Sequence, residues 1–119
     1  MTPPPTTTRR WRLLITPPMS GAWNMAIDQA LADLYPAQRQ ATLRFYRWDP
    51  PCLSLGLAQR LERDVDLAAC AARGITIVRR PTGGRAILHD REVTYALVTA
   101  VDDPLVGGAT IVQSYLAIS

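Results

Sequence analysis

Proline and glycine divide this sequence into short segments, and this division limits the fold more than any other feature. Pairs of prolines stand at 17–18 and 50–51, and a pair of glycines stands at 83–84. Proline removes a backbone donor and fixes φ, whereas glycine readily adopts left-handed backbone, so both interrupt regular structure. The chain is therefore expected to consist of short strands and helices joined by tight turns.

The expected strands are short apolar or alternating segments bounded by turn residues. They are 11–15, 42–47, 52–55, 75–78, 86–89 and 92–101. In the last of them, alternation places Val93, Tyr95 and Leu97 on one face.

Two helices are expected between these strands. The first runs from a Ser20 cap to Tyr35, because a proline follows. The second spans 64–73, capped by Asp64 and stopped by Gly74. The apolar residues of the first helix form one stripe at helical spacing: Trp23, Ile27, Ala30, Leu31 and Leu34.

The two ends of the chain differ from its middle. Residues 1–10 are rich in proline and threonine and are expected to be a disordered tail. A third helix is expected from Thr110, with Ile111, Val112, Tyr115 and Leu116 at its core positions. Such a stripe needs a layer to cover it. We therefore expect residues 11–119 to be the N-terminal part of a longer domain.

The composition suits one small globular domain. The chain has 119 residues, 48% of them apolar, and all thirteen basic residues are arginine. The net charge of +3 fits an acidic protein, nucleotide or nucleic-acid partner, or simply a solvated arginine-rich surface. Without lysine, this chain has no lysine nucleophile. No secretory signal and no apolar run of membrane length occurs, so we expect a cytoplasmic enzyme or binding module with no membrane partner.

The cysteines and the single histidine exclude several kinds of site. Cys52 and Cys70 have neither disulfide-framework nor metal-ligand spacing, and His89 alone leaves a zinc site short of ligands. Neither cysteine has a base nearby in sequence, so we interpret both as structural. His89 can face a ligand pocket or be a satisfied core histidine.

The strongest local feature is the run RRPTGGRAILHD, which begins at Arg79. Gly83 and Gly84 let the backbone approach a ligand, and their N–H groups can converge on an anion. Arg79, Arg80 and Arg85 bracket the turn with planar, two-pronged donors. An apolar strand leads away from the turn, so an anionic head and an apolar tail fit along one line. The alternative is an ordinary β-turn with solvated arginines.

Two polar pairs are further candidates. Asn24 and Asp28 lie one turn apart on the expected first helix, and Ser54 and Gln59 lie at the end of the strand 52–55. Each pair either lines a pocket or merely forms a solvated face or a strand end.

Three elements of the sequence resemble the family of lipoate–protein ligase A and the octanoyltransferases. The run from Arg79 looks like its Arg-Arg-x-(Ser/Thr)-Gly-Gly-x-Ala-x-x-His-Asp motif, and 21–28, GAWNMAID, resembles its Asn-Met-Ala-x-Asp helix. Residues 43–59 are similar to its arginine–aromatic strand and Ser-x-Gly-x-x-Gln element. The resemblance covers about 11–101.

This resemblance implies an α/β (α+β) fold of the biotin/lipoate ligase type, a mixed β-sheet flanked by helices and incomplete at its C-terminus. It also implies transfer of an octanoyl or lipoyl chain to a lysine of lipoyl-carrier domains. The implied acyl- or adenylate-binding residues are Arg80, Thr82, Gly83, Gly84, Arg85, Ala86, Ile87, Leu88 and His89, supported by Asn24, Asp28, Ser54 and Gln59.

Departures from the family pattern favour the octanoyltransferases over the ligases. Arg85 stands where ligases usually have a third glycine, and 91–95, REVTY, replaces their Leu-Gly-Asn segment. Octanoyltransferases use a cysteine nucleophile and a lysine partner. Both are expected beyond residue 119, so the chain alone is expected to lack activity. Gln29 stands where the family commonly has glutamate.

For octanoyl transfer the resemblance implies no cofactor. The implied partners are octanoyl-acyl carrier protein and apo lipoyl domains, such as the glycine cleavage H protein or E2 subunits. An alternative within the family is ATP-dependent lipoate ligation, which needs ATP and Mg²⁺. An alternative of another class is a non-catalytic arginine-rich module that binds nucleic acid. The sequence lacks the interleaved aromatic and basic residues of such modules, so we expect no nucleic-acid partner.

Overall fold

Six strands and three helices follow one another in residues 10–104, the part of the chain that the computed structural model describes. The strands are β1 (Arg12–Ile15), β2 (Thr42–Tyr46), β3 (Cys52–Leu55), β4 (Thr76–Arg79), β5 (Ile87–His89) and β6 (Thr94–Val98). The helices are α1 (Gly21–Gln38), α2 (Leu61–Asp64) and α3 (Leu67–Ala72). The first five strands lie within one residue of the expected bounds.

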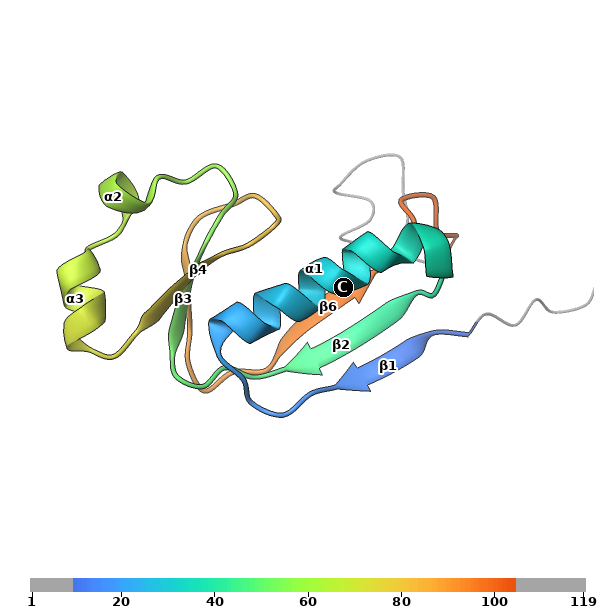
Figure 1. Ribbon diagram of the computed structural model, residues 1–119, viewed down its shortest axis with the longest axis horizontal. Helices are drawn as coiled ribbons and strands as arrows, with labels where there is room; N and C mark the ends of the chain where they lie inside the picture. The colour runs from blue at the N-terminus through green and yellow to red at the C-terminus, as the bar shows by residue number, and fades with distance from the viewer. Residues whose placement is uncertain (1–9, 105–119) are drawn as a thin grey trace, which may run out of the picture.

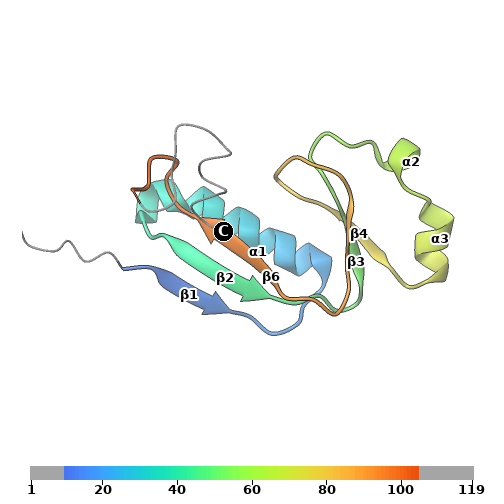
Figure 2. The ribbon, with the colours of Figure 1, turned by 180° about the vertical axis from the view of Figure 1, so that it is seen from behind.

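The strands form two mixed sheets of three strands each, in the orders β1-β2-β6 and β4-β3-β5. Each sheet joins one parallel and one antiparallel pair. In the first sheet, Phe45 of β2 lies between Ile15 of β1 and Tyr95 of β6. Helix α1 lies over β2 and β6, while α2 and α3 lie at the far end beside β3 and β4 (Figures 1 and 2). The expected mixture of strands and flanking helices is confirmed, with the strands divided between two sheets.

Helix α1 does not end where the sequence predicts. Ser20 caps it as expected, since its hydroxyl accepts a hydrogen bond from the Trp23 N–H. The prediction that Pro36 ends the helix at Tyr35 is wrong, because α1 continues through Pro36 to Gln38. Proline in the last turn removes only one intrahelical bond. The turn is then closed by Arg39, whose φ is 52° and whose N–H donates to the Tyr35 carbonyl.

The apolar stripe of α1 is not its buried face. Trp23 is 68% exposed and Leu34 is 49% exposed, whereas the buried positions are Gly21 and Asn24. Gly21 packs so closely on β3 that a Cβ there would collide with the Cys52 sulfur. Among residues 10–104, the helix therefore docks through a glycine and a buried amide rather than through its largest side chains.

The region expected to be one helix from Asp64 is two short helices. Asp64 is the last residue of α2, and its carboxylate accepts from the Arg60 N–H at 2.9 Å. Asp66 is the residue that caps α3, through a bond from the Ala69 N–H. Val65 is extended between them, which separates the two helices. Gly74 has φ +65°, as a left-handed stop requires.

Strand β6 is shorter than the expected 92–101, and the turn residues before it hold side chains of the site described below. The expected helix from Thr110 and most of the expected tail at 1–10 lie outside the described residues. Within residues 10–104, no helix is both long and apolar enough to cross a membrane.

A small cluster of buried side chains joins the two sheets. Tyr46 at the end of β2, Trp48 just after it and Cys52 of β3 are each at most 8% exposed and pack together. Met25 of α1 and Ala96 of β6 cover this cluster. The core therefore sits where α1 crosses from one sheet to the other, and the cavity described next opens beside it.

Candidate functional site

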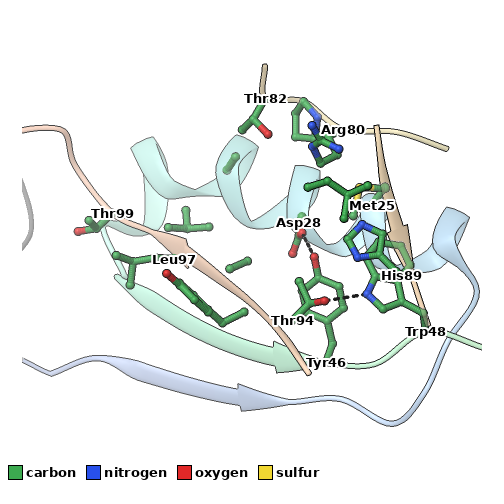
Figure 3. A pocket seen from close by; sticks show the side chains of 16 residues that line it. Met25, Asp28, Tyr46, Trp48, Arg80, Thr82, His89, Thr94, Leu97 and Thr99 are labelled. Atoms are coloured by element: carbon green, nitrogen blue, oxygen red, sulfur yellow. Dashed lines mark hydrogen bonds between the residues drawn. The ribbon is translucent and has the colours of Figure 1, made fainter. Parts of the chain in front are cut away.

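A cavity of about 490 Å³ lies between α1, the strands β2 and β6, and the segment that follows β4. Figure 3 shows Arg80 and His89 toward one end and Leu97 and Thr99 toward the other. Its lining comprises Met25, Asp28, Ala32, Tyr46, Trp48, Arg80, Pro81, Thr82, Ile87, His89 and the six residues 94–99. Most of these side chains are apolar, and the charged groups are confined to a few positions.

A buried ion pair fixes the inner wall of the cavity. Arg44 of β2 is fully buried, and its Nη1 donates to Asp28 Oδ1 of α1 at 2.8 Å. The Tyr46 hydroxyl donates to the other Asp28 oxygen at 2.8 Å. Burial raises the pKa of Tyr46, and the charge of Asp28 raises it further, so this hydroxyl keeps its proton. Asp28 thus faces the cavity with both oxygens already engaged.

Asn24 supports this pair from behind and does not line the cavity. Its Oδ1 accepts from Arg44 Nη2 at 2.7 Å, and its Nδ2 donates to the Arg47 carbonyl at 2.9 Å. Thr16 accepts a further bond from Arg44 at 3.1 Å. Asn24 and Asp28, one turn apart on α1, therefore act together on one buried guanidinium. Asn24 therefore has a structural role, whereas Asp28 also lines the cavity.

The arginines of the glycine loop bind main-chain carbonyls. Arg80 Nη1 donates to both the carbonyl and the hydroxyl of Ser54 at 2.8 Å, and its Nη2 donates to the carbonyls of Gly83 and Arg85 at 2.9 Å. Arg79 donates to three carbonyls after β3, including that of Gln59 at 2.6 Å. Arg80 therefore holds the glycine loop in shape and Arg79 holds the segment after β3, instead of presenting all their donors to an anion.

The fold requires glycine at one of the two loop positions, Gly84, and not at Gly83. Gly84 has φ +96°, a backbone conformation that residues with a side chain rarely adopt. Its carbonyl oxygen also packs against Gly56, so closely that a Cβ on Gly56 would overlap this oxygen. Gly83 meets open space. Within residues 10–104, the N–H groups of Gly83 and Gly84 have no hydrogen-bond partner. The loop therefore retains free amides beside the cavity wall formed by Arg80 and Thr82.

His89 is both a satisfied core histidine and a cavity residue. It is 5% exposed, with Nε2 at 2.7 Å from Ser54 Oγ and Nδ1 at 2.9 Å from Glu92 Oε1. Its ring stacks on Trp48 with the centroids 4.0 Å apart. Burial lowers the pKa of His89, and the positive Arg80 also lowers it, against the opposing effect of Glu92. Burial and the positive Arg80 therefore favour the neutral form of the ring.

The structure brings together some of the site residues proposed from the sequence and separates others. Those that line the cavity are Asp28, Arg80, Thr82, Ile87 and His89. Those that do not are Asn24, Ser54, Gln59, Gly83, Gly84, Arg85, Ala86 and Leu88. Ser54 instead bonds to Arg80 and His89 of the cavity, and Gln59 accepts from the Gly56 N–H at 3.0 Å.

Sequence reasoning missed Met25, Tyr46, Trp48 and Thr94 as cavity residues. Two of them belong to the arginine–aromatic strand, so the motif itself was a usable signal. Alternation shows that successive residues face opposite sides, but it does not show which side faces a ligand.

The cysteines stay outside this cavity. Cys52 is fully buried, and burial raises the pKa of its thiol, which disfavours the reactive thiolate. Cys70 lies on α3, at the other end of the described structure. No group of three or more histidine, cysteine or acidic side chains that could hold a metal ion occurs between Arg10 and Pro104.

Comparison with known proteins identifies relatives along most of the chain. Residues 20–118 match the model of the lipoyl protein ligase A/B catalytic domain. The octanoyltransferase LipM of Kyrpidia tusciae is 50% identical over 110 residues, and this chain spans 40% of its length. That alignment covers 92% of this chain.

Solved structures agree with this assignment. A bipartite lipoate protein ligase from Thermoplasma acidophilum, analysed with its E2 lipoyl domain, superposes with a TM-score of 0.72 at 32% identity, covering 81% of this chain and 38% of that one. Lipoate-protein ligase A bound with ATP gives 0.69 at 34% identity, covering 80% and 39%. The chain belongs to the lipoyl protein ligase A/B catalytic domain family.

Proposed function

We propose that this chain supplies the acyl-binding pocket of an octanoyltransferase that modifies lipoyl domains. The observation that carries the proposal is the mainly apolar cavity under α1, whose lining includes the polar side chains of Arg80, Thr82 and His89. The likeness to LipM supports octanoyl transfer within the family. The chain spans about two fifths of that relative, so the activity of a whole protein is part of the proposal.

The size and lining of the cavity suit a medium-length acyl chain. Its volume of about 490 Å³ lies within the range of roughly 300–1,000 Å³ typical of small-molecule sites. Met25, Ala96 and Val98 offer apolar contacts, and each buried methylene stabilises binding by about 0.8 kcal/mol. At the other end, the Thr82 hydroxyl is a donor for the acyl carbonyl.

The proposed reaction passes the acyl group through a thioester. A cysteine thiolate attacks the octanoyl thioester of acyl carrier protein and displaces the carrier's thiolate. A lysine amine of an apo lipoyl domain, such as a glycine cleavage H protein or an E2 subunit, then displaces the cysteine thiolate and forms an amide. Neither Cys52 nor Cys70 lines the cavity, so the nucleophile is proposed to come from a part of the family domain outside the described residues.

Ligand binding tests the pocket. Octanoate is expected to raise the Tm of the 119-residue chain, and hexanoate, with two methylenes fewer, to bind about 15-fold more weakly. Ala96→Leu places a larger side chain in the cavity and should abolish the octanoate shift, whereas Ala68→Leu, on the exposed face of α3, should preserve it. Equal affinities for octanoate and hexanoate would contradict an acyl pocket.

Turnover tests the proposed division of labour. Incubation of the 119-residue chain with octanoyl-acyl carrier protein and an apo lipoyl domain is expected to yield no octanoylated product by intact-protein mass spectrometry. Product formation would show that the chain holds its own nucleophile, and would overturn this part of the proposal.

The second candidate is an ATP-dependent lipoate ligase, favoured by the similarity to the ATP-bound ligase A. The described residues fit a triphosphate poorly, because the Nη groups of Arg80 and the Nη1 group of Arg79 that would bind phosphate already bond carbonyl or hydroxyl oxygens. Lipoate-stimulated ATP–pyrophosphate exchange by the longer family domain would favour ligation, and octanoyl transfer without ATP would favour the transferase.

A further inference from the structure

An unbroken chain of side-chain hydrogen bonds connects the glycine loop to β6. Arg80 Nη1 donates to Ser54 Oγ at 2.8 Å, Ser54 Oγ lies 2.7 Å from His89 Nε2, and His89 Nδ1 lies 2.9 Å from Glu92 Oε1. Thr94 Oγ1 then donates to Glu92 Oε2 at 3.1 Å. This series of hydrogen bonds connects both sheets, because Ser54 belongs to β3, His89 to β5 and Thr94 to β6.

The direction of these bonds follows from the donor inventory. Arginine can only donate, so Ser54 Oγ accepts from Arg80. The Ser54 side chain is fully buried, so its own proton needs an acceptor, and His89 Nε2 is the one at hydrogen-bond distance. The ring proton then sits on Nδ1 and is donated to the Glu92 carboxylate.

The hydrogen bonds at the Thr94 end of this series also have a fixed direction. Trp48 Nε1 can only donate, and it donates to Thr94 Oγ1 at 2.8 Å, which leaves the Thr94 proton for Glu92. Both carboxylate oxygens of Glu92 are therefore engaged. The same Trp48 ring stacks on His89 with the planes inclined by 10°. The imidazole is held at both nitrogens and on one face.

We propose that Glu92 is a positioning residue for the pocket, holding His89 as a neutral Nδ1–H imidazole that keeps Ser54 and Arg80 in place. Arg80 in turn donates to the carbonyls of Gly83 and Arg85. This series of hydrogen bonds from Glu92 to Arg80, called the relay below, therefore sets the shape of the glycine loop beside the cavity. On this inference, His89 does not transfer protons to the substrate, because its Nε2 lone pair is occupied. The inference rests on the proposed acyl pocket only for its effect on ligand binding.

The tautomer can be measured without any ligand. His89 is the only histidine, so a long-range ¹H–¹⁵N spectrum of the ¹⁵N-labelled 119-residue chain, with no histidine tag, reports on this ring alone. We expect the Nδ1–H tautomer at pH 7 and titration below the ordinary histidine pKa. An Nε2–H tautomer, or an imidazolium at pH 7, would overturn the proposal.

Variants of Glu92 test the positioning role. Glu92→Ala should weaken octanoate binding by about tenfold, within the range for a residue that acts through others. Glu92→Gln should bind octanoate nearly as tightly as the wild type, because the carbonyl oxygen of the glutamine can still accept from His89 Nδ1–H. It should also lower the pKa of His89 further, because the charge that favours the imidazolium is gone. Glu62→Ala, on the exposed face of α2, is the matched control and should change neither property.

The possible failures separate. If octanoate does not bind but His89 shows the Nδ1–H tautomer, the proposed function fails and the relay stands. If octanoate binds but Glu92→Ala leaves its affinity unchanged, or Glu92→Gln raises the pKa of His89, the positioning role fails and the acyl pocket stands. If Glu92→Ala does not fold, the wild-type tautomer and the Glu92→Gln titration still decide the proposal.

Discussion

The two faces of the sheet β1-β2-β6 reverse the usual distribution of polar and apolar side chains. The face toward α1 carries Thr42, Arg44 and Tyr46 of β2, each at most 4% exposed. The opposite face carries Leu43 and Phe45, which are only partly buried in the described part of the chain. Their strand neighbours on that face are also apolar, and the register aligns them in two rows, Leu13–Leu43–Leu97 and Ile15–Phe45–Tyr95.

The difference shows that the face under α1 is held together mainly by directional hydrogen bonds and less by burial of apolar area. Burying a charge is unfavourable unless the charge is paired and hydrogen-bonded. The two Nη groups of Arg44 are stabilised by hydrogen bonds to Asp28, Asn24 and Thr16. Such a network admits few alternative arrangements, which suits the wall of a binding site. The opposite face has no comparable network within residues 10–104.

The largest expected effect comes from breaking the ion pair on the face toward α1. Asp28→Ala leaves Arg44 buried without its carboxylate and should lower the free energy of unfolding by about 3 kcal/mol. Urea unfolding measures this change. Asp33→Ala, at an exposed position of the same helix, is the control and should cost less than about 0.5 kcal/mol.

Recovery of stability in an Asp28→Ala/Arg44→Met double variant would show that the cost arises from the uncompensated charge. A loss below about 1 kcal/mol in Asp28→Ala alone would remove the basis for treating this face as a buried electrostatic network.

The same substitution, tyrosine to phenylalanine, can be made on both faces of the sheet. Tyr46→Phe removes the hydroxyl that donates to Asp28 and should cost about 1.5 kcal/mol, as expected for a hydrogen bond to a charged group. Tyr95 also borders the cavity, but its side chain is 51% exposed on the other face. Tyr95→Phe should therefore change stability by less than about 0.5 kcal/mol. Parallel thermal and urea unfolding would test the pair, and equal costs would contradict the assignment of the two faces.

Local sequence patterns predicted the succession of strands well and the faces of elements poorly. Turn residues bound the strands closely enough that five of them lie within one residue of expectation. The predicted apolar stripe of α1, by contrast, includes Trp23, and that side chain is 68% exposed. Burial depends on which surfaces meet in three dimensions, and periodicity contains no such information.

The site shows the same division. The glycine motif predicts a turn, which the structure places beside the cavity, but the motif alone does not decide between an anion-binding turn and an ordinary β-turn with solvated arginines. The structure shows the Arg80 guanidinium bound to Ser54, Gly83 and Arg85. Glu92 lies three residues after His89, within the segment 91–95. The bond to His89 Nδ1 depends on a turn between two sheets, which residue spacing alone does not specify.

The smallest effect is expected on the apolar face, at Ile15, which is 72% exposed. Ile15→Thr keeps a β-branched side chain suited to a strand and removes little buried apolar surface, so the free energy of unfolding should change by less than about 0.5 kcal/mol. A loss above about 1.5 kcal/mol in the 119-residue chain would show that this side chain is buried in the folded protein. The contrast between the two faces would then lie in how each is buried, by hydrogen-bonded charge on one side and by apolar contact on the other.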